Sequence, residues 1–69
     1  MKLSARNVLK GRVVTVEKGA TTAVVKIDIG GGTIITSSIT VEAANDLGLI
    51  AGDSAYAIIK ASEVIVGRD

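Results

Sequence analysis

The chain has 69 residues, a formal net charge of +1 and neither cysteine nor histidine. A chain of this length forms at most one small domain, which buries only about 60% of its unfolded surface and is marginally stable as a monomer. Disulfides, thiolate chemistry and the common zinc ligands are excluded, so oligomerisation is the expected source of additional stability.

Valine and isoleucine dominate the apolar residues, and Tyr56 is the only aromatic residue. Because β-branched side chains suit a pleated surface, we expect a mostly β fold. Eight basic and seven acidic residues are mixed along the chain, which disfavours a nucleic-acid partner. No apolar run reaches the roughly 18 residues that span a bilayer, and no signal peptide is recognisable. The sequence therefore predicts a cytoplasmic protein without a membrane partner.

The first strand is predicted over residues 8–17, with Gly11 as a bulge or bend, and a turn at residues 18–20 follows it. A second strand over residues 22–29 is the clearest of all, because its apolar and polar residues alternate. Apolar residues at 23, 25, 27 and 29 are expected to share the buried face.

Gly30–Gly32 predicts a tight hairpin into a third strand over residues 33–39, since glycine adopts positive φ without strain. The same residues belong to the string Asp28-Ile29-Gly30-Gly31-Gly32-Thr33, which matches the DxGGGT motif with which actin-like and sugar-kinase ATPases hold phosphate. That fold needs two large lobes, for which this chain is too short. We therefore interpret the triplet as a hairpin.

Thr40 precedes VEAANDLG, which predicts a helix of about two turns that Thr40 caps and Gly48 ends. Two more strands are predicted over residues 54–60 and 64–66. The order of elements predicts a small five-stranded OB-like barrel with one short helix between strands three and four. An open meander with a helix on one face is the alternative architecture.

Catalysis is not expected, because without histidine or cysteine no nucleophile stands beside a base and an orienting group. Short polar side chains and two cations instead occur at the edges of predicted strands, as a site for a tetrahedral oxyanion requires. Hydroxyl groups, backbone amides and cations all donate hydrogen bonds, and the oxygens of a dianion only accept them. The candidate residues are Ser4, Ala5, Arg6, Thr40, Lys60, Ala61 and Ser62.

The string SARN, followed by Lys10-Gly11 and a valine-rich strand, resembles the opening of the Mop domain of molbindins and of the related TOBE domains. Ile39-Thr40, Leu47-Gly48 and the segment from Ile59 to Val64 continue the resemblance, so that it covers essentially the whole chain. Val8 departs from the family pattern, which usually has Gln at this position.

This resemblance implies that residues 1–69 form a single Mop domain that binds molybdate or tungstate between subunits, without an organic cofactor or a bare metal cation. It carries over Ser4, Ala5, Arg6, Thr40, Lys60 and Ala61 as ligand-binding positions. It also implies a hexamer built as a trimer of dimers, with a second type of site near the threefold axis at Gly19, Ala20 and Thr21. The implied role is storage or buffering of the oxyanion by a free form of the domain.

Two other classes of function stay open from the residues alone. The first is a nucleic-acid-binding OB module, which the scarcity of aromatic residues disfavours because such modules stack bases on aromatic rings. The second is a purely structural oligomerisation domain.

Overall fold

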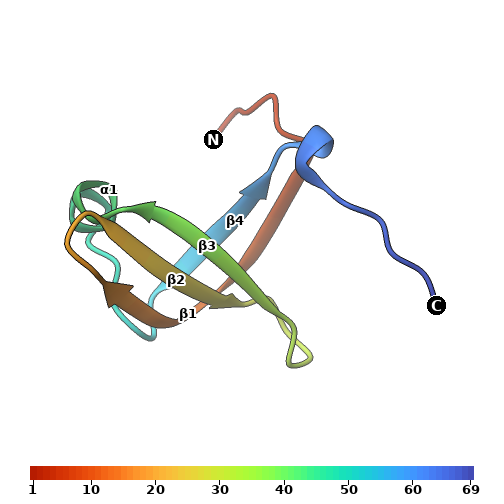
Figure 1. The fold of residues 1–69 in the computed structure, drawn as a ribbon. Helices are drawn as coiled ribbons and strands as arrows, with labels where there is room; N and C mark the ends of the chain where they lie inside the picture. The colour runs from red at the N-terminus through yellow and green to blue at the C-terminus, as the bar shows by residue number, and fades with distance from the viewer.

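A computed structural model describes residues 1–69, which form one curled antiparallel sheet and one α-helix (Figure 1). The strands follow the order β3-β2-β1-β4 across the sheet, and the helix connects β3 to β4. The elements are β1 (Asn7–Lys18), β2 (Thr22–Asp28), β3 (Ile34–Thr40), α1 (Val41–Leu47), β4 (Ser54–Ile59) and the short 3₁₀-helix η1 (Ala61–Glu63). The predicted mostly β fold and the position of the helix are confirmed.

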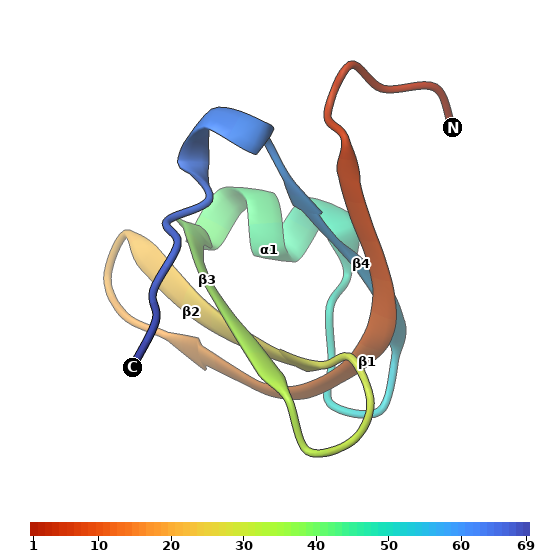
Figure 2. The same ribbon diagram turned by 90° about the vertical axis from the view of Figure 1, so that its right-hand side faces the viewer.

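Strand β1 is long enough to pair with two neighbours, and this curls the sheet (Figure 2). Its first half pairs with β4 from Asn7 to Arg12, and its second half pairs with β2 from Arg12 to Lys18. Gly11 lies just before the change of partner, where a Cβ atom would stand 2.5 Å from the Asp28 carbonyl oxygen. Glycine is therefore needed here for close approach of two backbones.

The register of the β1–β2 pair shifts between Val13 and Thr15. The bulge therefore lies at Val14, three residues beyond Gly11, and of the two roles predicted for Gly11 only the bend is compatible with the structure. Bulges of this kind increase local twist and bend a strand. The bulge at Val14 helps β1 to change its pairing partner from β4 to β2.

The glycine triplet forms the predicted hairpin between β2 and β3. All three glycines have positive φ, at 109°, 62° and 80° for Gly30, Gly31 and Gly32. The Ile29 amide donates to the Thr33 carbonyl at 3.0 Å, and the Asp28 carboxylate accepts from the Gly30 amide at 2.8 Å. Hydrogen bonds within the turn therefore hold the glycine triplet in place.

Helix α1 begins and ends as its terminal residues predict. Thr40 is the N-cap, with its hydroxyl oxygen accepting from the Ala43 amide at 3.0 Å, and Glu42 stands in the first turn. Gly48 adopts the left-handed conformation at φ 62° and ends the helix. Ala44 is the buried residue of α1. At seven residues, α1 is too short to cross a membrane, and no other helix is longer.

The core of a single chain is small. Only six of 69 residues are buried, and the central cluster consists of Val13, Val25, Ile27 and Ala57. Several large apolar residues remain half or more exposed, among them Leu47 at 68% and Ile50 at 65%. As the short chain predicts, one copy leaves extensive apolar surface uncovered.

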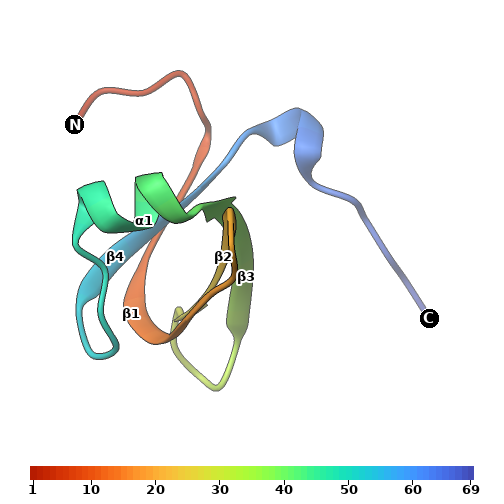
Figure 3. The same cartoon turned by 60° about the vertical axis from the view of Figure 1, so that its left-hand side comes forward.

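The predicted fifth strand over residues 64–66 is wrong. Two turn hydrogen bonds, from Glu63 N to Lys60 O at 2.9 Å and from Val64 N to Ala61 O at 3.2 Å, bend the chain into η1 after β4. The chain then runs outward as an extended tail (Figures 1 and 3). With four strands, the sheet forms an open half-barrel whose edges are β3 and β4. The prediction of a small five-stranded OB-like barrel is corrected accordingly.

Candidate anion site

The N-terminal segment lies beside the end of β4, although the two are distant in sequence. Asn7 pairs with Ile59 across the sheet, and the Asn7 side-chain amide donates to the Ile59 carbonyl at 3.1 Å. Ser4–Arg6 leads directly into this pair and Lys60–Ser62 leads directly out of it. Six of the seven predicted ligand-binding residues therefore gather at one end of the sheet, and we call them the Lys60 cluster: Ser4, Ala5, Arg6, Lys60, Ala61 and Ser62.

The Lys60 cluster is open to solvent. Ala5 is half-buried and the other five residues are exposed. The first hydrogen bond of η1 is donated by the Glu63 amide, so the Ala61 amide is not used within η1. Hydroxyl groups, backbone amides and the two cations, Arg6 and Lys60, make this end of the sheet rich in hydrogen-bond donors. The one carboxylate in η1, that of Glu63, is exposed.

Thr40 lies apart from the Lys60 cluster within one chain. It ends β3, pairs with Thr22 and begins α1, whereas η1 follows the far end of β4. Figure 1 shows the start of α1 and η1 at opposite ends of the sheet. A single copy therefore does not bring all seven predicted residues together.

The three residues predicted for a second site lie next to Thr40. The Val41 amide donates to the Thr21 carbonyl at 2.9 Å, and the Gly19 amide donates to the Thr22 carbonyl at 2.8 Å. Gly19, Ala20 and Thr21 are all exposed. We call these three residues and Thr40 the Thr40 cluster.

The cap role of Thr40 leaves its hydroxyl hydrogen available. The oxygen accepts the Ala43 amide, and a hydroxyl group also carries one donor that can rotate. Capping a helix and donating to an anion are thus compatible roles for this side chain.

Comparison with known proteins identifies the family. The family model of the TOBE domain matches residues 3–66. The chain belongs to the TOBE domain family. It is 54% identical over 67 residues to the probable molybdenum-pterin-binding protein of Haemophilus influenzae, with 97% of each chain covered.

Two solved structures have the same fold as this TOBE domain. A molybdate-binding protein from Sporomusa ovata has a TM-score of 0.92 at 37% identity, covering 99% of this chain and all of its own. The molybdate-bound form of the cytoplasmic molybdate-binding protein ModG has a TM-score of 0.90 at 55% identity, covering 94% of this chain and 46% of its own. These comparisons confirm the resemblance to molbindins that the SARN segment indicates.

Asn7 was not among the predicted ligand-binding residues, yet it positions the segment that carries three of them. It belongs to the SARN string, but its side chain acts within the chain by holding the N-terminal segment of the TOBE domain against β4. A polar residue at the start of an otherwise apolar strand was the available signal. Its partner, the carbonyl of Ile59, carries no signal in the sequence.

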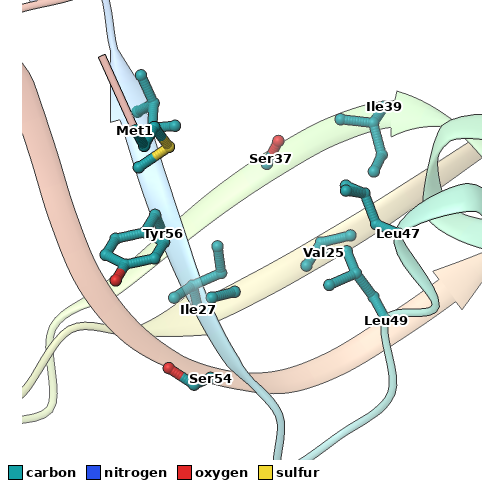
Figure 4. Close-up of a pocket in the computed structure, with 11 residues that line it drawn as sticks. Met1, Val25, Ile27, Ser37, Ile39, Leu47, Leu49, Ser54 and Tyr56 are labelled. Carbon is teal, nitrogen blue, oxygen red and sulfur yellow. The ribbon is translucent and has the colours of Figure 1, made fainter. Parts of the chain in front are cut away.

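A cavity of about 400 Å³ opens on the concave side of the TOBE domain, between α1, β4 and the β2–β3 hairpin (Figure 4). Its walls are mainly aliphatic, and no charged side chain lines it, although the N-terminal residue Met1 is part of the lining. A dianion would lose its hydration there without gaining a charged side chain as a partner. The cavity is therefore not the anion site, and we call it the apolar groove.

Proposed function

We propose that this TOBE domain binds molybdate, and tungstate as a close analogue, at sites between copies of the chain. The observation that carries the proposal is the Lys60 cluster, where the Asn7–Ile59 pairing sets two donor-rich segments beside each other. The molybdate-binding relatives support the choice of ligand.

The chemistry of the Lys60 cluster suits a small dianion. Molybdate at neutral pH carries two negative charges, and its four oxygens only accept hydrogen bonds. Five or six bonds to a charged group at about 1.5–3 kcal/mol each contribute about 7.5–18 kcal/mol, which reaches or exceeds the roughly 8 kcal/mol of micromolar affinity. The excess offsets desolvation and the loss of freedom on binding. Arg6 and Lys60 supply the positive charge.

Thr40 joins this site from another copy of the chain. Its distance from η1 within one chain supports an intersubunit arrangement, because one copy alone does not bring the seven candidate residues together. The assembly we propose is a hexamer, built as a trimer of dimers. Gly19–Thr21 supplies a second type of site, near the threefold axis, largely through backbone groups.

The proposed role is storage and homeostasis of the oxyanion in the cytoplasm, by binding rather than catalysis. Residues 1–69 act as one binding domain in this proposal. The description of ModG as a cytoplasmic molybdate-binding protein supports the location.

Equilibrium dialysis tests the ligand directly. The protein is dialysed against molybdate, tungstate, sulfate and single-stranded DNA, and its mass is measured by native mass spectrometry in parallel. We expect saturable binding of molybdate and tungstate by an oligomer. Binding of DNA alone would favour the OB module, and a stable oligomer that binds none of the four would favour a purely structural domain.

A further inference from the structure

The turn between β1 and β2 contains hydrogen-bond donors that the chain itself does not use. The Gly19 amide donates to the Thr22 carbonyl at 2.8 Å, whereas the amides of Ala20 and Thr21 donate no backbone hydrogen bond. Thr21 adds a hydroxyl group, which carries a donor that can rotate. All of these residues are exposed, so their donors are available to a ligand.

An anion at this turn also needs a counter-charge, and residues 19–21 carry none. The turn and α1, with their flanking residues, correspond to the segments 17–22 and 40–48, in which Lys18 is the only cation. The same two segments contain three exposed carboxylates, those of Glu17, Glu42 and Asp46. Binding of a dianion here therefore depends on Lys18 more than on any other nearby side chain.

The Lys18 ammonium is held on α1. Its Nζ atom donates to Asn45 Oδ1 at 2.7 Å, across 27 positions of sequence. The acceptor is a neutral amide, so the hydrogen bond does not cancel the charge of the ammonium. An ammonium has three donors, and two of them remain for a ligand.

The Lys18–Asn45 bond places this charge close to the turn. The Val41 amide donates to the Thr21 carbonyl at 2.9 Å, which sets the start of α1 against the turn (Figures 1 and 3). Val41 and Asn45 are four positions apart and share one face of the helix, and side chains on a helix lean toward its N-terminus. The ammonium therefore lies within about one helical turn, roughly 5.4 Å along the axis, of the point where Thr21 meets α1.

We propose that Lys18 is the charged ligand-binding residue of the second type of site, and that Asn45 is a positioning residue that holds it there. This inference rests on the second site of the proposed function and specifies the charge that the backbone groups of Gly19–Thr21 do not supply. A threefold axis repeats each residue three times, so three ammonium groups compensate the dianion and the nearby carboxylates.

Calorimetric titration with molybdate tests the role of Lys18. Lys18→Gln should weaken the second class of sites at least about tenfold, and should leave the first class, at the Lys60 cluster, within about twofold of the parent. Lys18→Arg keeps the charge and should recover most of the affinity. Lys26→Gln is the matched control, because it removes the same charge from an exposed position on β2 outside both clusters, and it should change neither class.

Substitutions at Asn45 separate the position of the ammonium from its charge. Asn45→Ala leaves the ammonium untethered and should weaken the second class less than Lys18→Gln does. Asn45→Asp keeps an acceptor for Lys18 Nζ but adds a carboxylate beside it, so the second class should weaken as strongly as in Lys18→Gln. Parent-like affinity in Asn45→Asp would show that Asn45 does not hold Lys18 at the site. Circular dichroism and native mass spectrometry verify that each variant is folded and assembled.

Two results would overturn the role of Lys18 and leave the Lys60 cluster as the anion site. One is a single class of molybdate sites in the parent protein that Lys60→Ala weakens. The other is a second class of sites that Lys18→Gln affects no more than Lys26→Gln does. A parent protein that binds no molybdate would contradict both the proposed function and this inference.

Discussion

The Asn7 side-chain amide donates to the main-chain carbonyl of Ile59 at 3.1 Å, across 52 positions of sequence. This bond fixes the spacing between Ser4–Arg6 and Lys60–Ser62, since each segment is continuous with one of the two bonded residues. A half-buried bond of this type constrains the candidate site more than an exposed one does, because water competes less with it.

Asn7→Ala is therefore expected to destabilise the protein by about 1 kcal/mol and to weaken molybdate binding as well. Urea unfolding at fixed protein concentration and calorimetric titration measure the two effects. Asn45→Ala is a matched control, because it removes the exposed hydrogen bond from Lys18 Nζ at 2.7 Å. It should change the free energy of unfolding by no more than about 0.5 kcal/mol. Unchanged molybdate affinity in Asn7→Ala would show that this bond does not organise the site.

Gly11→Ala is expected to destabilise the fold by about 1–3 kcal/mol through overpacking. The new methyl group would stand 2.5 Å from the Asp28 carbonyl oxygen and 2.7 Å from Ile27 Cγ2, so β1 and β2 must separate. Gly67→Ala is the control, since nothing lies within 4 Å of its Cβ position. Thermal unfolding measures the stability of both variants. Equal stability of Gly11→Ala and Gly67→Ala would mean that β1 and β2 separate without loss of stability.

Substitutions at Thr40 separate its two roles. Thr40→Ala should cost about 1 kcal/mol of stability through the lost cap, and should also weaken binding through the lost donor. Thr40→Asp keeps an oxygen that accepts from the Ala43 amide, so stability should be preserved. Its negative charge should nevertheless abolish detectable binding of a dianion at this site. Parent-like molybdate affinity in Thr40→Asp, measured by calorimetry, would remove Thr40 from the site.

Replacing Lys60 and replacing Arg6 should weaken molybdate binding to different extents. Lys60→Ala is expected to weaken molybdate binding by about 1.5–3 kcal/mol, as for a hydrogen bond to a charged group. Arg6→Ala should cost less, because its backbone amide remains as a donor. Lys26→Ala, an exposed cation on β2 outside the Lys60 cluster, is the control for general loss of positive charge. Equal losses in all three variants would indicate attraction by net charge alone.

Added chloride should weaken molybdate binding only modestly. A ligand enclosed by donors is screened less than one held at an open charged surface. Binding to the phosphates of DNA, by contrast, loses roughly 10³–10⁵ in affinity between 50 and 200 mM salt. Titration with molybdate across that range measures how affinity depends on salt concentration. A loss of affinity as large as that for DNA phosphates would contradict an enclosed site.

Local features of this protein were predictable because their causes lie within a few residues. The positive φ angles of Gly30–Gly32 make a hairpin, and Thr40 and Gly48 bound α1 through hydrogen bonds that reach three or four positions along the chain. Alternation in β2 likewise identified Ala23, Val25 and Ile27 as buried residues, whereas Ile29, the fourth residue predicted on that face, follows β2 and is only half-buried. The candidate residues themselves were recognised from local strings such as SARN.

The grouping of the candidate site residues was decided by the tertiary structure. The sequence does not show that β1 changes its pairing partner near Gly11. Before this change, β1 pairs with β4, which places Ser4–Arg6 beside Lys60–Ser62. After it, β1 pairs with β2, and β2 pairs with β3, which ends at Thr40 at the other end of the sheet. The apolar composition of Val64–Val66 predicted a strand, but strand formation requires an edge within reach, and η1 directs the tail away from the edges of its own sheet. Local strings set turns and caps, whereas strand pairing depends on contacts between distant segments.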